Sequence, residues 1–152
     1  MTKDIPRVLR EHVLDGVRAR LRAAGPCILV VAGRDDAAAL RSATSGDGAW
    51  LELARLDEVE LPALGRELAR LLKPGAPVAC VARAGASWRR ALEPLVSWRR
   101  SRGLDILLPA APEWPCRHPL SFALLAAAEH VVSGWPLVRG LGRWVVHEGV
   151  RR

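Results

Sequence analysis

The stretch that decides the fold is LGRELARLLKPGAPVACV, residues 64–81. Its first half places leucines three and four residues apart, which is the spacing of one helix face, and the stripe begins upstream at Leu61. Lys73-Pro74-Gly75 then ends the helix, because glycine and proline after a periodic run stop it. Pro77 to Ala82 is an uninterrupted apolar run. The stretch therefore predicts a helix that leads directly into a buried strand.

Upstream, the pattern predicts another helix and two more strands. Residues 4–24 repeat apolar side chains at three- and four-residue steps, and Asp4 can cap the start of this helix. Cys27 to Ala32 is a continuous apolar run, typical of a strand that is covered on both faces. A short helical piece at 37–43 and a polar turn then lead to a strand at 50–54.

Downstream, the same alternation continues to the end of the chain. We expect a helix over 87–103, a strand at 105–108, and a long proline-rich loop before the apolar segment 120–132. A last strand follows at 143–150. Strands that alternate with helices indicate an α/β fold: a three-layer, mostly parallel, Rossmann-like sheet of about five strands. We find no repeat or linker, so residues 1–152 are interpreted as one domain.

Composition narrows the class of protein. Half of the 152 residues are apolar and 26% are charged, which suits a globular domain with its own core. No stretch approaches the roughly 18 unbroken apolar residues of a membrane span, and the N-terminus has no apolar signal segment. The three cysteines are odd in number and far apart, without metal-ligand spacing. We therefore expect a cytoplasmic protein without a metal site or a membrane partner.

Residues 64–81 also resemble the class I S-adenosylmethionine methyltransferases. In that family a helix of the type L-x-E-x-x-R-x-L-K-P-G-G runs into the fifth strand of the sheet. This chain agrees with the motif at Glu67, Arg70, Leu72, Lys73, Pro74 and Gly75. Residues 50–59 and 137–146 look like the family's fourth strand and its C-terminal end, and Cys27–Ala32 sits where its first strand would be. The resemblance implies a reduced methyltransferase fold as a single methyltransferase-like domain.

The chain departs from the family where the cofactor would bind. The family's first strand leads into a turn with several glycines, which let the backbone approach the cofactor, whereas only Gly33 is present here. Thirteen residues separate Asp36 from Trp50, and one strand–helix–strand unit needs about 30. We therefore expect the adenosine-binding half to be missing and no cofactor to be bound. If S-adenosylmethionine does bind, the resemblance implies contacts from Gly33, Asp35 and Asp57.

Arginine dominates the formal net charge of +7. A basic surface favours nucleic acid, but arginine-rich composition also arises without any functional demand. The segment Ser-Trp-Arg-Arg occurs twice in the predicted helix over 87–103 and concentrates positive charge there. Tryptophan among arginines can stack on bases. The candidate residues for weak nucleic-acid or anion binding are Arg89, Arg90, Arg99, Arg100 and Arg102. The alternative is a solvated basic face with tryptophans at the edge of the core.

Partner binding is the last hypothesis that the residues support. Without the family's second and third strands, Cys27–Ala32 becomes an edge of the sheet, and its apolar Ile28 and Val30 could pair with another chain. Trp114 and Trp135 lie in proline-containing stretches, where large aromatic side chains often mark a contact surface. A homodimer or a complex with another protein is expected.

No catalytic set stands out. His12 lies on the apolar face of the first helix and is interpreted as a packed histidine, and no histidine accompanies a serine or cysteine nucleophile. The function we favour is that of a non-catalytic methyltransferase-like scaffold, a pseudoenzyme that binds a protein partner. The alternatives are an active methyltransferase, alone or completed by a partner chain, and nucleic-acid binding through the basic helix.

Overall fold

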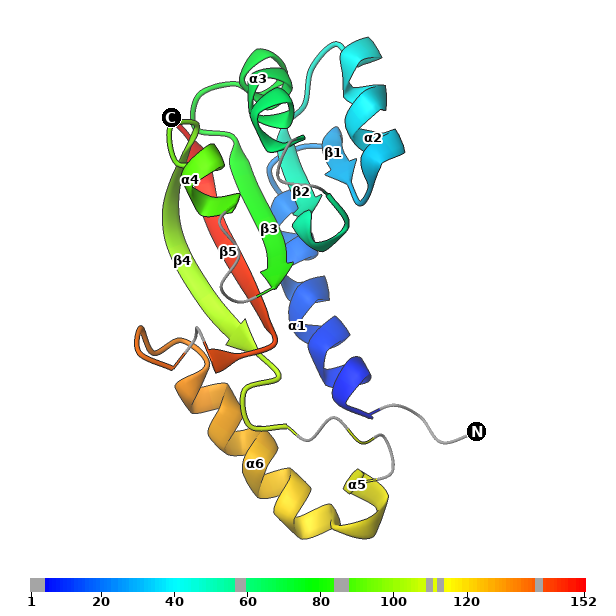
Figure 1. Ribbon diagram of the computed structural model, residues 1–152, viewed down its shortest axis with the longest axis vertical. Coiled ribbons are helices and arrows are strands. Elements are labelled where there is room, and N and C mark those ends of the chain that lie inside the picture. Colours follow the sequence, from blue (N-terminus) through cyan, green and yellow to red (C-terminus); the bar gives the residue numbers. More distant parts are fainter. Residues whose placement is uncertain (1–4, 57–59, 84–87, 109–110, 112–113, 139–140) are drawn as a thin grey trace.

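The structure is a computed structural model that describes residues 5–56, 60–83, 88–108, 111, 114–138 and 141–152. A five-stranded sheet is flanked by helices, and Figure 1 shows how they are arranged. The strands are β1 (Ile28–Val31), β2 (Gly48–Glu52), β3 (Pro77–Arg83), β4 (Val96–Leu104) and β5 (Trp144–Arg151). The helices are α1 (Ile5–Arg22), α2 (Arg34–Ala39), α3 (Leu61–Leu71), α4 (Trp88–Leu92), α5 (Trp114–Arg117) and α6 (Pro119–Val132), with 3-10 turns at Leu40–Ser42 and Leu53–Arg55.

The strand order is β1-β2-β3-β5-β4. β1 pairs with β2 and β2 with β3 in parallel, whereas β5 runs antiparallel to both of its neighbours, β3 and β4. Four of the five strands therefore point the same way, which confirms the mostly parallel Rossmann-like sheet. β1 lies at one end of this order, so the prediction that it forms an edge is confirmed.

Two cores lie on opposite faces of the sheet and make the three layers. The larger core packs α3, α4 and the segment around Leu40 against Leu51 and Cys80. The smaller core packs α1, through Leu14, Val17 and Leu21, against alternate residues of the same strands, such as Trp50. Adjacent strand residues thus face different cores, which explains why the buried strands read as unbroken apolar runs.

The deciding stretch folds as predicted. Leu61, Leu64, Leu68 and Leu71 are all buried along one side of α3. The helix stops before Gly75, whose φ of +83° lies in the left-handed region that glycine adopts without strain. The Gly75 N–H then donates to the Arg151 carbonyl, 2.8 Å away, which fastens the helix exit to the last strand of the sheet.

The predicted helix over 87–103 is wrong. Among the described residues α4 covers only Trp88–Leu92, and β4 then runs from Val96 to Leu104. Pro94 gives the reason, because its ring cannot continue a helix, and the downstream residues pair with β5. The strand predicted at 105–108 is also wrong: these residues form bends after β4. The first of them, Asp105, has a positive φ, at which the chain turns away from the sheet.

Two burial predictions are corrected. Cys27–Ala32 is not covered on both faces, because the Val30 side chain is 54% exposed while Leu29 and Val31 are buried. His12 is exposed rather than packed, because the first half of α1 extends past the sheet, where Val8 is also exposed. The predicted cap at Asp4 lies outside the described residues.

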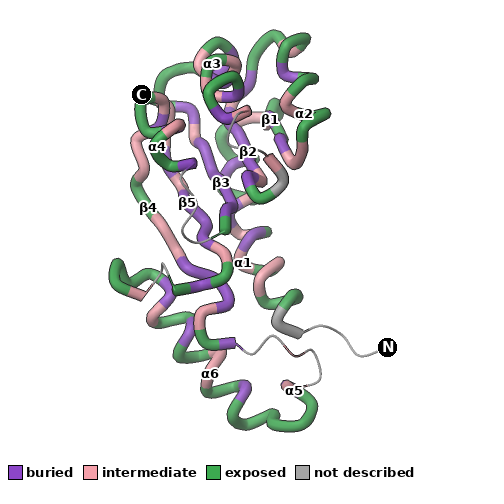
Figure 2. Tube along the Cα trace, in the orientation of Figure 1, coloured by how far each residue is buried: buried purple, intermediate pink, exposed green. Residues whose placement is uncertain are grey.

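At the end of the molecule opposite α2 and α3 lie α5 and α6 (Figure 1). Figure 2 shows that most of α6 is exposed, in contrast to the buried β3. Within the described part of the chain, no helix combines the length and the apolar character needed to cross a membrane.

Candidate functional site

The turn after β1 is where a cofactor would approach the backbone. Gly33 precedes α2 with extended backbone, φ −174°, and a Cβ placed on it would meet nothing within 4 Å. No close approach of other protein atoms therefore requires glycine at this position. The Asp36 carboxylate accepts a hydrogen bond from the Ala32 N–H at 2.9 Å, so this side chain closes the turn from within.

Of the other two predicted cofactor contacts, the structure describes only Asp35. Asp35 is exposed in the first turn of α2, which has only six residues. Asp57 lies outside the described residues. Arg34 pairs with Glu60 at 2.6 Å, so the surface between α2 and α3 is bridged by protein charges. Among the described residues, β1 has a neighbouring strand on one side only, β2.

The exposed edge at β1 is the clearest feature that both sequence and structure identify. α2 and the Leu40–Ser42 turn cover only one face of β1, where Leu29 and Val31 join the larger core. On the other face, Ile28 packs against the core beneath α1, and Val30 lies beyond that cover. Of the two contact residues predicted on β1, Val30 is therefore accessible and Ile28 is partly buried.

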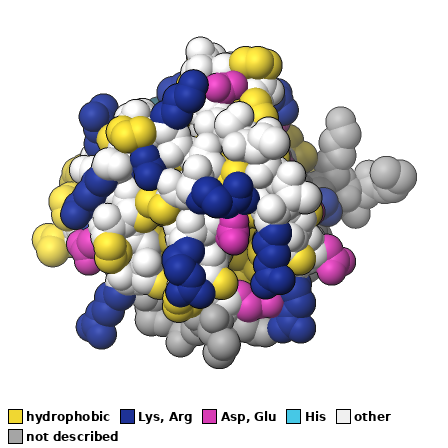
Figure 3. All heavy atoms as spheres, turned by 90° about the horizontal axis from the view of Figure 1, so that it is seen from above, with side chains coloured by type: hydrophobic (Ala, Val, Ile, Leu, Met, Phe, Trp, Pro, Cys, Tyr) yellow, Lys and Arg dark blue, Asp and Glu magenta, His cyan; other side chains and the backbone are white. Residues whose placement is uncertain are grey.

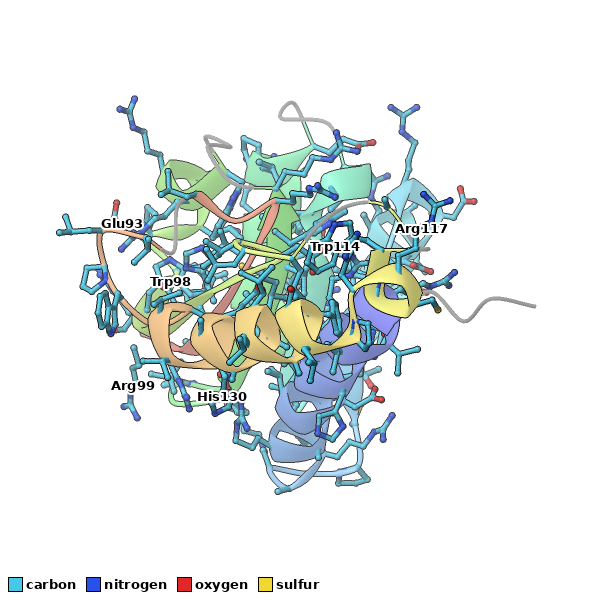
Figure 4. The ribbon with its side chains drawn as sticks, turned by 90° about the horizontal axis from the view of Figure 1, so that it is seen from below. Glu93, Trp98, Arg99, Trp114, Arg117 and His130 are labelled. Atoms are coloured by element: carbon cyan, nitrogen blue, oxygen red, sulfur yellow. The ribbon has the colours of Figure 1, made fainter. Side chains whose placement is uncertain are left out.

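The five candidate arginines do not line one helix. Arg89 and Arg90 are exposed on α4, whereas the other three lie on β4. Arg99 points away from the body of the molecule (Figure 4), and Arg100 is also exposed. The single basic helix is therefore wrong, and nucleic-acid binding by these side chains stays a prediction. Figure 3 shows that Lys and Arg side chains at the α2–α3 end are spread out rather than gathered in one stripe.

Arg102 is engaged inside the protein. Its Nε donates to Ser133 Oγ at 2.7 Å, and its terminal nitrogen lies 2.9 Å from His130 Nδ1. Burial lowers the pKa of the Arg102 guanidinium, and the nearby positive charge of Arg100 lowers it further. Arg102 therefore fastens α6 to β4 instead of reaching toward a ligand.

The two predicted contact tryptophans differ in exposure. Trp135 is more than half exposed after α6. Trp114 is half-buried, and its ring lies 5.1 Å from that of His118. Figure 4 shows Trp114 and Arg117 together at the beginning of α6.

Sequence reasoning missed a groove of about 550 Å³ at the ends of β2 and β3. Arg10 and Arg83 both lie over the Trp144 ring, 5.8 and 5.7 Å from its centroid, and Arg18 lies 4.6 Å from that of Trp50. Arg10 and Arg18 also form ion pairs with acidic side chains. In the sequence, Arg10 and Arg18 fit the solvent-exposed side of an amphipathic helix, and no local pattern connects them with Arg83 or Trp144.

The structure brings one histidine against a serine, which the sequence did not predict: the contact joins β4 and β5 and is partly buried. Ser101 Oγ lies 2.6 Å from His147 Nδ1, and the histidine ring packs between Trp88 and Trp98. Cys80, opposite His147 in the sheet, is fully buried, and burial raises the pKa of its thiol well above the usual value. The described residues contain no cluster of potential metal ligands.

Comparison with solved structures found similarity in fold. The N-methyltransferase NodS from Bradyrhizobium japonicum WM9 is 12% identical, with 72% of this chain and 52% of that chain covered at a TM-score of 0.43. A complex of the Haloferax volcanii Trm112 methyltransferase activator with a methyltransferase is 20% identical, with 70% and 54% covered at 0.39. The cyclase SpnF is 17% identical, with 70% and 50% covered at 0.37.

The chain spans about half the length of these proteins. No family model matches it, and comparison with curated proteins found no similar sequence. Its five-stranded mixed sheet with flanking helices is a mostly parallel, Rossmann-like sheet.

Proposed function

We propose that this chain is a non-catalytic, methyltransferase-like domain that binds another protein chain by strand addition at β1. The observation that carries the proposal is the open edge of β1 with its exposed, apolar Val30. An edge strand presents unpaired N–H and C=O groups, and an extended segment of a partner can bind them. The partner is a second copy or another protein.

The two edges of the sheet differ in a way that supports this proposal. β4, at the far edge, has a bulge between Trp98 and Arg100 and exposed arginines at 99 and 100. Bulges and charges are the devices that keep an edge strand from pairing with other chains. The paired residues of β1 contain no bulge, no charged side chain and no proline. β1 is therefore the edge on which an added strand is tolerated.

The expected test result is that lysine at position 30 weakens association. We expect Val30→Lys to weaken it about tenfold, because a charge at the centre of an added strand loses hydration. Light scattering over a concentration series measures self-association, and affinity capture with the wild-type chain as competitor measures binding to a host protein.

Val8→Lys is the matched control, because Val8 on α1 is as exposed as Val30. It should associate like the wild type, and circular dichroism should show that both variants are folded. A wild-type chain that stays monomeric at high concentration and captures no partner would overturn the proposal.

The active-methyltransferase alternative predicts cofactor binding. We expect titration calorimetry of the pure chain with S-adenosylmethionine to give no saturable heat. The reasons are the Asp36 carboxylate, which closes the turn after β1 by accepting a hydrogen bond from the Ala32 N–H, and the presence of a single glycine, Gly33, in that turn. Saturation in the low-micromolar range would favour the alternative instead.

Nucleic-acid binding is the second candidate, and the exposed Arg99 and Arg100 on β4 favour it. Separate guanidinium groups contact phosphates rather than base edges, so such binding would be weak, salt-sensitive and independent of sequence.

A further inference from the structure

α6 is apolar on the side that faces solvent as well as on the side that packs. Toward the protein it buries Phe122 and Glu129. Toward solvent it presents Leu120, Leu124 and Val131, which recur at the spacing of one helix face and are 81%, 73% and 63% exposed. A surface helix of a globular protein normally has polar side chains on that side. α6 therefore has an unpartnered apolar face.

The chain after α6 extends this surface. Trp135, Leu137 and Leu141 are all exposed, and Leu137 is 94% exposed. We call the exposed apolar residues of this region the apolar end: Leu120, Leu124, Val131, Trp135, Leu137 and Leu141. Figure 4 looks onto this part of the molecule from below, with α6 lying across it. Exposed apolar patches of this kind mark interaction surfaces.

The exposed charged side chains among the described residues of 114–144 are positive. Residues 114–144 include three arginines and one acidic residue, Glu129. The Glu129 carboxylate is buried and accepts hydrogen bonds from the backbone N–H groups of Leu107 and Leu108, at 3.0 and 3.2 Å. No negative side chain therefore reaches solvent from the described residues of this segment, whereas Arg117 and Arg143 are exposed.

Against the expectation from the sequence that the protein has no membrane partner, we propose that the apolar end docks onto the surface of an anionic lipid bilayer. Leucines would enter the region between head groups and acyl chains, arginines would meet lipid phosphates, and Trp114 and Trp135 would lie near the interface. A protein partner fits less well, because a protein interface carries many hydrogen bonds and the outward face of α6 has polar groups only at Ser121 and His130.

The helix is held in a fixed position for such docking. Besides the Glu129 bonds, the Gly103 N–H donates to the Ser133 carbonyl at 2.8 Å, and Arg102 contacts both Ser133 and His130. α6 has 14 residues and is about 21 Å long, so it is too short to span a bilayer and would lie flat on it.

The test is co-sedimentation of the full chain with vesicles of phosphatidylcholine, with and without phosphatidylglycerol. We expect binding to the anionic vesicles that weakens as salt is raised, since salt screens the attraction. Leu124→Glu and Leu137→Glu should each reduce the partition coefficient at least about tenfold, because each removes a leucine from the lipid contact. Leu124→Gln should reduce it too, which separates loss of apolar contact from added charge.

Ala38→Glu is the control, because it adds the same charge at an exposed position on α2, at the other end of the molecule. It should bind like the wild type, and circular dichroism should show all variants folded. Absence of wild-type binding to anionic vesicles would overturn the proposal. So would a dimer in solution that Leu124→Glu dissociates, because a second copy would then cover the apolar end. Vesicle binding in this test does not involve Val30, so its outcome does not depend on strand addition at β1.

Discussion

Leu68→Ala should destabilise the protein more than any other single leucine truncation on α3. The Leu68 side chain is fully buried at the centre of the stripe, within the larger core. Truncation to alanine removes apolar contacts and leaves a cavity, which costs about 2–5 kcal/mol. Domains of this size have a free energy of unfolding of about 5–15 kcal/mol, so the variant loses a large share of its stability.

Urea unfolding followed by circular dichroism measures this loss as a lower midpoint at unchanged slope. Leu124→Ala is the matched control, because Leu124 is an equal leucine on a helix but is mostly exposed. We expect its midpoint to stay within experimental error of the wild type. Equal effects for the two variants would contradict the placement of α3 against the sheet.

Asp105→Ala should cost about 3 kcal/mol through two separate losses. The Asp105 carboxylate is buried and accepts a hydrogen bond from the Arg10 guanidinium at 2.6 Å, which joins the end of β4 to α1. The residue also has a φ of 56°, in the left-handed region that aspartate and asparagine tolerate better than alanine. The variant therefore loses an ion pair and gains backbone strain.

Asp105→Asn separates the two losses, because asparagine keeps the tolerance for positive φ but loses the charge. It should fall between the wild type and Asp105→Ala in urea unfolding. Asp15→Ala is the control, since Asp15 forms an exposed ion pair with Arg18 and should cost less than about 1 kcal/mol. If Asp105→Ala were as mild as Asp15→Ala, the contact between β4 and α1 would be wrong.

Elements with a strong local pattern were predictable. The leucine stripe of α3, its stop at Gly75 and the apolar run of β3 agree closely with the structure, because periodicity and helix caps act over a few residues. The edge position of β1 was also predictable, because too few residues separate Asp36 from Trp50 in the sequence to form another strand–helix unit. The region after Pro94 was not predicted correctly, because arginines and tryptophans there suit either a helix face or an edge strand.

The candidate site residues were predictable only in part. Val30 was expected at an open edge, and it is exposed there. Arg102 was expected to face a ligand, yet it binds Ser133, which is distant in sequence. The groove with Arg10, Arg83 and Trp144 could not be found from the sequence, because its lining comes from α1, β2, the turn Leu53–Arg55, β3 and β5.

The sequence by itself determined the α/β class, the reduced sheet and the absence of several glycines after β1, because these depend on local spacing and residue type. Only the tertiary structure decided that β4 is the far edge strand, that α1 extends past the sheet and leaves His12 exposed, and that α6 keeps an apolar face in solvent. The physical reason is that burial is decided by what packs against a residue. An apolar helix pattern is the same whether one side or both sides find a partner.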